Sequence, residues 1–441
     1  MAILFGAVAD DDTGATDLAG MLADQGVRTI LAIGLPGPDR LDAWAAQSDA
    51  VILGVGSRAL APGTAYDRMR EGVRLLGTLR PAVVQVKYCS TFDSTSEGNI
   101  GPSIDAALDE LGEAFTIALP ALPVNGRTTY MGYHFVHQQL LSDSPMRHHP
   151  LTPMTNSNLV THLQSQTQRR VGLAPYPKLQ AGAQSLRNCF EKLRDSGVNI
   201  AVVDCTSDAD LAIACQAARD LRLISGSSAL AMMLPGFWKH DGWKPAGHAS
   251  LLPLNAKPGR GFLIVSGSCS QATQRQNEVI AASGVRIIDL DGVRLAVGDN
   301  DFGPIAALAV SELAEGRTCV LRTSSSRADV NRVHQWAQRN GHTETEVGRQ
   351  IAFRLARVVR EIVQSNKPEG LIIAGGETSG ALCRTLEFDA LRVGANIEPG
   401  VPLCVSLDNA SLPTVLKSGN FGGPDFYHRA IEAIRGLRRD T

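Results

Sequence analysis

The sequence lacks several features that would mark a particular class of protein. Its 441 residues contain no apolar run near the roughly 18 residues that a membrane span requires. The first residues, MAILFGAVADDD, show no basic stretch followed by an apolar segment and a cleavage site, so no secretory signal is expected. The eight cysteines include no CxxC pair, which argues against a zinc site or a disulfide framework. A net charge of -2 gives no general attraction for nucleic acid or an anionic membrane. We expect a cytoplasmic protein that binds neither.

Two common nucleotide-binding motifs are also missing. The sequence contains neither GxxxxGK[ST] nor GxGxxG, so it predicts neither a P-loop nor a Rossmann dinucleotide site. The absence of GxGxxG weakens the hypothesis of a dehydrogenase. Any phosphate group must therefore be bound by turns of another kind.

What is present is an alternation of short β-rich runs with helix-forming segments. Strands are expected over 3–9, 27–33, 50–55, 82–86, 115–119, 199–204, 221–225, 261–265, 285–290, 318–321, 371–374, 401–407 and 413–416. Helices are expected over 15–24, 104–111, 209–219, 271–282 and 344–364. This alternation predicts an α/β fold with largely parallel sheets flanked by helices on both faces.

The length of the chain exceeds what one hydrophobic core usually supports. We expect two such α/β domains, residues 1–245 and 261–441, joined by a linker over 246–260, with an active-site cleft between them. The segment 128–179 is the least regular part of the sequence, and long irregular stretches often carry function.

Ligands of open parallel sheets bind beyond the carboxyl ends of the strands, so the residues that follow strands are the candidates. In the first half these are Asp10-Asp11-Asp12 and the segment KYCSTFDST at 87–95. A helix cap would use only one of three adjacent aspartates, and the hydroxyl groups could merely cap a helix. The alternative is that these groups hold the hydroxyls of a polyol while one carboxylate acts as a general base.

Arginines in the first half could clamp a carboxylate or a phosphate group. Arg127 and Arg147 suit this role because a guanidinium can bind such groups bidentately. His148 and His149 are adjacent and point in different directions, so we do not expect a metal site built from both. At most one of them is expected to contact a substrate.

The second half places small residues between strands and helices at SGSCS, 266–270, and GGETSG, 375–380, with KSGNFG following at 417–422. Unpaired N–H groups at a helix start attract phosphate. Lys417 could neutralise a phosphate group and Glu377 could reach Mg²⁺. The residues alone therefore predict a two-domain enzyme that transfers a phosphoryl group.

Seven motifs, in order, resemble the four-carbon acid sugar kinase family and most closely its 3-oxo-tetronate kinase branch: ADDxTGATD, KYCSTFDSTxxGNIGP, ALPVNGRTTYxGYxFV, MRHHPLTPM, SGSCSxxTxxQ, IIAGGETSG and LKSGNFGG. The resemblance runs from about residue 3 to residue 432. It implies that the first domain binds an acid sugar, that the second binds ATP with Mg²⁺, and that the γ-phosphate is transferred to the 4-hydroxyl of 3-oxo-tetronate. Asp12 departs from the family, in which Leu or Phe is usual.

The resemblance also implies site residues. For the nucleotide these are Ser266 or Ser268, Gly376, Glu377, Thr378, Ser379 and Gly419, to which the residue argument adds Lys417. For the substrate they are Asp10, Asp11, Arg58, Lys87, Ser90, Asp93, Asn125 and Arg127, to which it adds Arg147.

Asp11 or Asp93 is expected to be the base or hydroxyl-orienting group. Two alternatives stay open: a kinase of D-threonate or D-erythronate, and a regulator that binds nucleotide and metabolite without catalysis. A homodimer is compatible with the sequence.

Overall fold

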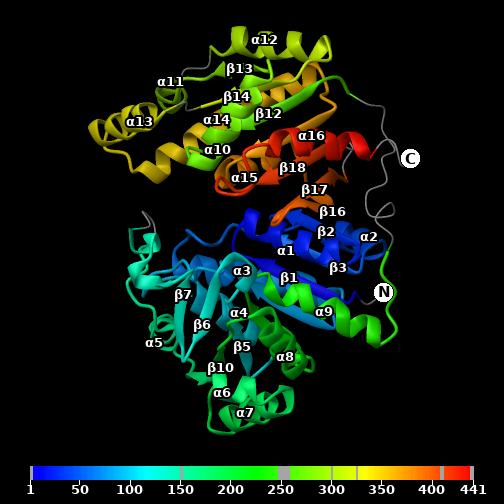
Figure 1. The fold of residues 1–441 in the computed structure, drawn as a ribbon, viewed down its shortest axis with the longest axis vertical. Helices are drawn as coiled ribbons and strands as arrows, with labels where there is room; N and C mark the ends of the chain where they lie inside the picture. Colours follow the sequence, from blue (N-terminus) through cyan, green and yellow to red (C-terminus); the bar gives the residue numbers. More distant parts are fainter. Residues whose placement is uncertain are drawn as a thin grey trace. The chain divides into compact units, whose positions relative to one another are not determined.

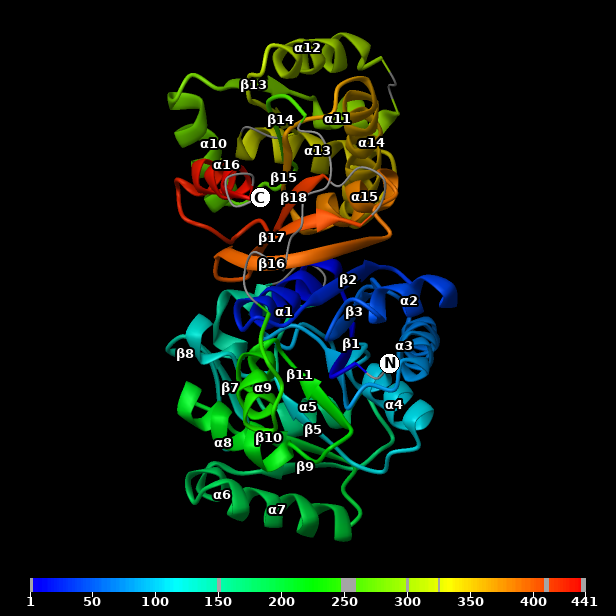
Figure 2. The same ribbon diagram turned by 90° about the vertical axis from the view of Figure 1, so that its right-hand side faces the viewer.

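The structure is a computed structural model that describes residues 3–148, 152–246, 259–298, 301–323, 326–407 and 412–437. The chain divides into two compact units, Met1–Ala246 and Gly247–Thr441, shown as ribbons in Figures 1 and 2. Most of the predicted linker, residues 247–258, lies outside the described residues, as does His149. Within the described part of the chain, no helix is long and apolar enough to cross a membrane.

The first unit is built on a parallel sheet with the strand order β2-β3-β1-β4-β11-β5-β10-β9. Its strands are β1 Phe5–Ala9, β2 Thr29–Ile33, β3 Ala50–Gly54, β4 Val83–Lys87, β5 Thr116–Leu119, β9 Val171–Ala174, β10 Ile200–Val203 and β11 Leu223–Gly226. Seven of these strands were predicted, and each begins and ends within two residues of its predicted bounds. β9 was not predicted.

Helices cover both faces of this sheet, as the alternation predicted. The Phe5 ring packs against Trp238 of α9, with 6.1 Å between the ring centroids, whereas Val8 lies beside Gly72 of α3. Side chains three positions apart on a strand point to opposite faces, so α9 and α3 lie on opposite sides. The helices are α1 Asp12–Asp24, α2 Pro38–Ala45, α3 Pro62–Thr78, α4 Ile100–Leu111, α5 Leu159–Gln164, α6 Tyr176–Gln180, α7 Ala183–Asp195, α8 Asp208–Ala218 and α9 Ala229–His240.

The segment that looked irregular contains a second, antiparallel sheet of β6 Arg127–Tyr130, β7 Tyr133–Val136 and β8 Gln139–Leu140. The turn between β6 and β7 is bonded by a residue that is distant in the sequence. The N–H groups of Met131 and Gly132 donate to the carboxylate of Asp204 at 2.7 and 2.9 Å. The segment predicted to be the least regular part of the sequence thus contains short strands, and their turn is bonded by a residue more than seventy positions away.

The second unit has the strand order β13-β14-β12-β15-β18-β17-β16. The strands are β12 Phe262–Ser266, β13 Arg286–Asp289, β14 Cys319–Arg322, β15 Gly370–Ala374, β16 Ala390–Glu398, β17 Val401–Ser406 and β18 Pro413–Lys417. The helices are α10 Gln271–Ala282, α11 Gly292–Val297, α12 Gly303–Ala314, α13 Arg327–Arg339, α14 Glu344–Ser365, α15 Gly376–Thr385 and α16 Phe426–Gly436. β17 and β18, both predicted strands, pair antiparallel, and β17 also pairs antiparallel with the unpredicted β16.

Candidate functional site

The carboxyl end of β1 carries a buried ion-pair cluster. Asp10 is 6% exposed and accepts two hydrogen bonds from Arg58, Nε to Oδ2 and Nη2 to Oδ1, both at 2.8 Å. Nη2 also donates to Oδ1 of Asp11 at 2.9 Å. Paired charge-assisted bonds of this kind fix geometry as well as charge. Three of the five N–H donors of Arg58 are therefore used by protein carboxylates, and its Nη1 donors remain for other acceptors.

The two aspartates of this cluster differ in their tendency to hold a proton. Burial raises the pKa of Asp10, and the Arg58 cation offsets only part of that effect. Burial also raises the pKa of Asp11, but Arg58, Lys87 and two local hydrogen bonds outweigh it and hold the pKa below its usual value. Those local donors are the Thr13 hydroxyl and the Gly14 N–H, each at 2.8 Å, so Asp11 is also the N-cap of α1.

Four of the predicted substrate residues line one small pocket at this edge of the sheet: Asp10, Arg58, Lys87 and Asp93. Lys87 is the last residue of β4 and is 2% exposed. Asp93 accepts a 2.6 Å hydrogen bond from the Thr91 hydroxyl. The structure therefore brings acids and cations from three separate segments to one place.

Asn99 also lines this pocket and was not among the predicted site residues. Its Nδ2 lies 2.8 to 3.0 Å from the carbonyl oxygens of Ser57, Arg58 and Leu60, so it anchors the loop that carries Arg58. The signal was present in the GNIG motif, but only the fold shows that its amide reaches back some forty residues.

A buried histidine supports Ser90. The Nε2 of His134, on β7, lies 2.8 Å from the carbonyl oxygen of Ser90, and its Nδ1 lies 3.0 Å from the Thr129 hydroxyl. Burial lowers the pKa of His134 to about 4, so the ring is neutral near pH 7. Because the carbonyl can only accept, Nε2 carries the proton and Nδ1 accepts from Thr129. No sequence motif pointed to this histidine.

Asp17 is a second buried acid that the sequence analysis did not select. One carboxylate oxygen accepts from the Ser228 hydroxyl, and the other has no hydrogen-bond partner among the described residues. Burial raises the pKa of Asp17, against the nearby charges of Lys87 and Arg127. A charged residue on the buried side of a helix with few polar positions was the signal that could have identified it.

Arg127 and Arg147, the two arginines predicted to clamp a carboxylate or phosphate group, differ in burial and in hydrogen bonding. Arg127 donates through Nη1 to the carbonyl oxygen of Asn125, and its buried Nε has no partner among the described residues. Arg147 is exposed, and its guanidinium donates to the carbonyl oxygen of Ser142 at 3.1 Å. Its contact with a substrate stays a prediction.

In the second unit, two glycine-containing turns lie against each other. The N–H groups of Gly267 and Ser268, after β12, both donate to the carbonyl oxygen of Ala374 at 3.0 Å. A side chain on Gly267 would overlap Thr378, so glycine permits this approach. α15 starts after Gly375, whose φ of 132° favours glycine, and no side chain caps its N-terminus. Unpaired N–H groups at such a helix start favour phosphate.

These turns form one wall of a pocket of about 290 Å³. The wall includes Gly376, Glu377 and Thr378. The opposite side carries the apolar side chains of Val330 and Val333 on α13 and Ile351 and Leu355 on α14, beside the polar ones of Asp329, His334 and Glu344. A pocket with an apolar wall and a phosphate-attracting wall suits a nucleotide.

The remaining predicted nucleotide residues surround the same turns. Ser266 is buried, and its hydroxyl accepts from Asn277 Nδ2 at 2.9 Å. Ser268 lies against Gly419, where any side chain would overlap it. Ser379 is 1% exposed, and its hydroxyl has no partner among the described residues.

Lys417 lies beneath these turns rather than in the open pocket. It is 0% exposed, and its Nζ donates to the Thr273 hydroxyl, the Ser418 carbonyl and the Gly419 carbonyl at 3.0 to 3.1 Å. An ammonium group has three N–H donors, so all of them have protein acceptors here. Lys417 therefore braces the 417–419 turn, and it has no free donor for a phosphate group in this arrangement.

Comparisons with known proteins match the two halves of the chain to two different domain families. One family model, described as a sugar-binding N-terminal domain, matches residues 5–234, and another, described as a nucleotide-binding C-terminal domain, matches residues 263–427. Two curated relatives named 3-oxo-tetronate kinase, from Pseudomonas fluorescens and Cupriavidus necator, are each 40% identical over 98% of this chain and cover 97% and 98% of their own lengths. Crystal structures of proteins from Salmonella typhimurium LT2 and Haemophilus influenzae match with TM-scores of 0.80 and 0.75. Both are 32% identical to this chain over 97% of its length. The match covers 98% of the Salmonella protein and 100% of the Haemophilus protein.

Proposed function

Since the chain belongs to the four-carbon acid sugar kinase family, in its 3-oxo-tetronate kinase branch, we propose that it phosphorylates 3-oxo-tetronate with ATP. The observation that carries the proposal is the pairing of two unlike sites. One unit has a small pocket of acids and cations, and the other has a nucleotide-sized pocket with a phosphate-attracting wall. We propose that the reaction takes place in the cytoplasm.

The acid sugar carries a carboxylate and hydroxyl groups, and the first-unit pocket supplies partners for both. Lys87 and the free Nη1 donors of Arg58 can bind the carboxylate, while the aspartates can accept from hydroxyls. The pocket has a volume of only about 10 Å³, so surrounding side chains must move when the substrate binds, whereas Asp10 and Arg58 already hold each other in place.

In the proposed step, the oxygen of the 4-hydroxyl attacks the γ-phosphorus of ATP, the bond from that phosphorus to ADP breaks, and a carboxylate takes the hydroxyl proton. We assign this role to Asp93 rather than Asp11. Asp11 already accepts from Arg58, Thr13 and Gly14 and has a lowered pKa, both of which make it a weak base. Asp93 lines the pocket and, among the described residues, accepts a hydrogen bond from Thr91 alone.

The triphosphate is expected at the start of α15 and the base of ATP against the apolar wall. Phosphoryl transfer depends mainly on positioning the reactants and on balancing phosphate charge. Mg²⁺ would arrive with ATP, because no group of three or more His, Cys, Asp or Glu side chains among the described residues is arranged to hold a metal ion. In kinase sites, substrate phosphates and one or two carboxylates often suffice for Mg²⁺, and Glu377 is the carboxylate at this turn.

The test is an ATP-dependent ADP-release assay over four-carbon acids. The highest kcat/KM is expected with 3-oxo-tetronate, and lower values with D-threonate and D-erythronate. A higher value for either reduced acid would move the protein to that substrate. No ADP release with any of these acids, from a folded protein that binds ATP, would favour a non-catalytic regulator instead.

A further inference from the structure

The nucleotide site needs a cation that Lys417 does not supply. ATP brings several negative charges to the start of α15, and backbone N–H groups balance only part of them. Because every N–H donor of Lys417 already has a protein acceptor, any side-chain cation that contacts the phosphates in addition to the Mg²⁺ of ATP comes from elsewhere in the unit. The nearest candidates lie on α14, which packs along α15.

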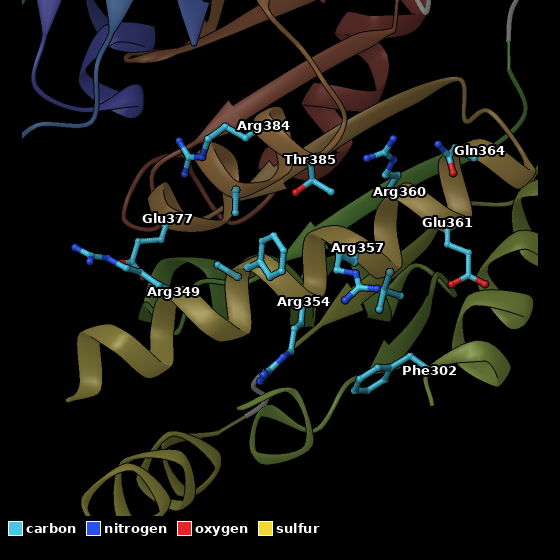
Figure 3. Close-up of a pocket in the computed structure, with 14 residues that line it drawn as sticks. Phe302, Arg349, Arg354, Arg357, Arg360, Glu361, Gln364, Glu377, Arg384 and Thr385 are labelled. Carbon is cyan, nitrogen blue, oxygen red and sulfur yellow. The ribbon is translucent and has the colours of Figure 1, made fainter. Parts of the chain in front are cut away.

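A second pocket, of about 830 Å³, adjoins the nucleotide pocket and shares Ala352 and Glu377 with it. Figure 3 shows its lining residues, which come largely from α14 and α15. Its cations are Arg349, Arg354, Arg357, Arg360 and Arg384.

Geometry separates Arg349 from the other four. Arg354 donates to the carbonyl oxygens of Leu295 and Ala296, and Arg360 pairs with Glu387 at 2.9 Å. Arg357 lies eight residues beyond Arg349, about 12 Å along the helix. Arg384 lies eight residues beyond Gly376 on α15, about 12 Å from the helix start.

Arg349 follows a residue of α14 that lies close to Glu377 in the phosphate turn. A side-chain carbon placed on the preceding Gly348 would be 3.1 Å from Oε2 of Glu377. In Figure 3, the side chains of Arg349 and Glu377 extend toward the same end of the pocket from their two helices. The Arg349 charge also acts on Glu377, because it opposes the rise in the pKa of Glu377 that burial causes.

We propose that Arg349 is a nucleotide-binding residue that contacts the terminal phosphate groups of ATP at the start of α15, beside Glu377. The inference rests on the proposed function, because it requires the second unit to bind ATP. It adds a cation from α14 to a site that otherwise consists of glycine-containing turns. A guanidinium on this side can bridge two phosphate oxygens, which a buried lysine cannot do.

The test compares the dissociation constants of ATP, ADP and AMP by calorimetry for the wild type, Arg349→Ala and Arg349→Lys, with Arg357→Ala as the matched control. Loss of a charge-assisted bond is expected to weaken ATP binding roughly 10-fold or more. AMP binding should change little, and ADP should fall between them. Arg349→Lys should recover part of the ATP affinity, and Arg357→Ala should leave all three constants near the wild-type values.

Several results would overturn the inference. Equal losses for AMP and ATP would mean that Arg349 only supports the fold of the pocket, and unchanged ATP affinity would mean that it makes no phosphate contact. An equal loss in Arg357→Ala would show a diffuse effect of surface charge. These results concern Arg349 alone, since the kinase proposal is tested by wild-type turnover. A wild type that binds no adenine nucleotide would refute both.

Discussion

Lys417 offers a quantitative test of how the phosphate turn is braced. The ordinary pKa of a lysine is 10.5, and burial lowers that of Lys417 to about 8. The perturbation is Lys417→Met, which keeps the length of the side chain and removes its charge. Each pKa unit corresponds to about 1.36 kcal/mol, so the difference between the folded and unfolded values corresponds to about 3 kcal/mol.

The sign follows from proton binding. Between pH 8 and 10.5 the unfolded lysine holds a proton that the folded one has lost, so raising the pH through this range stabilises the wild-type fold. Below about pH 8 both states are protonated and the folded protein carries the full cost of the buried charge. The Met variant lacks this dependence. The stability of the wild type relative to Lys417→Met should therefore rise by up to about 3 kcal/mol between pH 7.5 and pH 10.5.

The assay is urea unfolding with pulse proteolysis, read by mass spectrometry on peptides of the second unit, so that the two units are followed separately. Comparing wild type and variant at each pH cancels the groups that titrate in both. Lys367→Met, at a partly exposed lysine of the same unit, controls for the loss of a lysine. A difference between wild type and Lys417→Met that stays constant across this pH range would refute the reasoning, because it would mean that burial does not perturb Lys417.

Three further predictions concern the two sites. Asp93→Asn should lower kcat roughly 100-fold or more with little change in KM, whereas Asp11→Asn should lower it less; the opposite order in steady-state assays would make Asp11 the base. Gly267→Ala should raise KM for ATP because the added carbon would overlap Thr378. Gly303→Ala is the control and should leave KM unchanged, because no atom lies within 4 Å of the added carbon. Equal KM values for the two variants would contradict this account. Burial lowers the pKa of His134 from 6.5 to about 4, so lowering the pH between these values should destabilise the wild type more than His134→Gln. The measurement is the urea midpoint of both proteins against pH. Parallel curves would show that His134 is not buried as a neutral ring.

The fold could be predicted where hydrophobic runs and glycines coincide. Gln271–Ala282 was predicted with both of its ends, since Ser270 caps its start and Ser283-Gly284 follows its last turn. β16 was missed because Gly394 and Asn396 interrupt its apolar pattern, and the structure shows register shifts there. β6 and β7 were missed because their turn depends on Asp204, which no local pattern indicates.

The site residues divide in a similar way. Asp10, Arg58, Lys87 and Asp93 were predicted and are brought to one pocket, because each follows or ends a parallel strand or lies in a loop at that edge. Asp17 and His134 were not predicted, because their relevance depends on burial beside residues distant in sequence. The position of Lys417 in the sequence was informative, but the direction of its amine was not, since only packing decides which acceptors it meets.

The hydrogen-bond donors of Arg58 and Lys87 explain how a pocket rich in acids can select an anionic sugar. Asp10 and Asp11 would repel a carboxylate, but Arg58 already bonds both of them and balances one of their two charges before a substrate arrives. The donors left over are the Nη1 group of Arg58 and the Nζ of Lys87, whose one protein acceptor is the Tyr88 carbonyl at 3.1 Å. A neutral sugar would leave these remaining donors without a charged partner, which costs binding free energy. The pocket should therefore discriminate against sugars that lack the carboxylate more strongly than between four-carbon acids that differ in one hydroxyl.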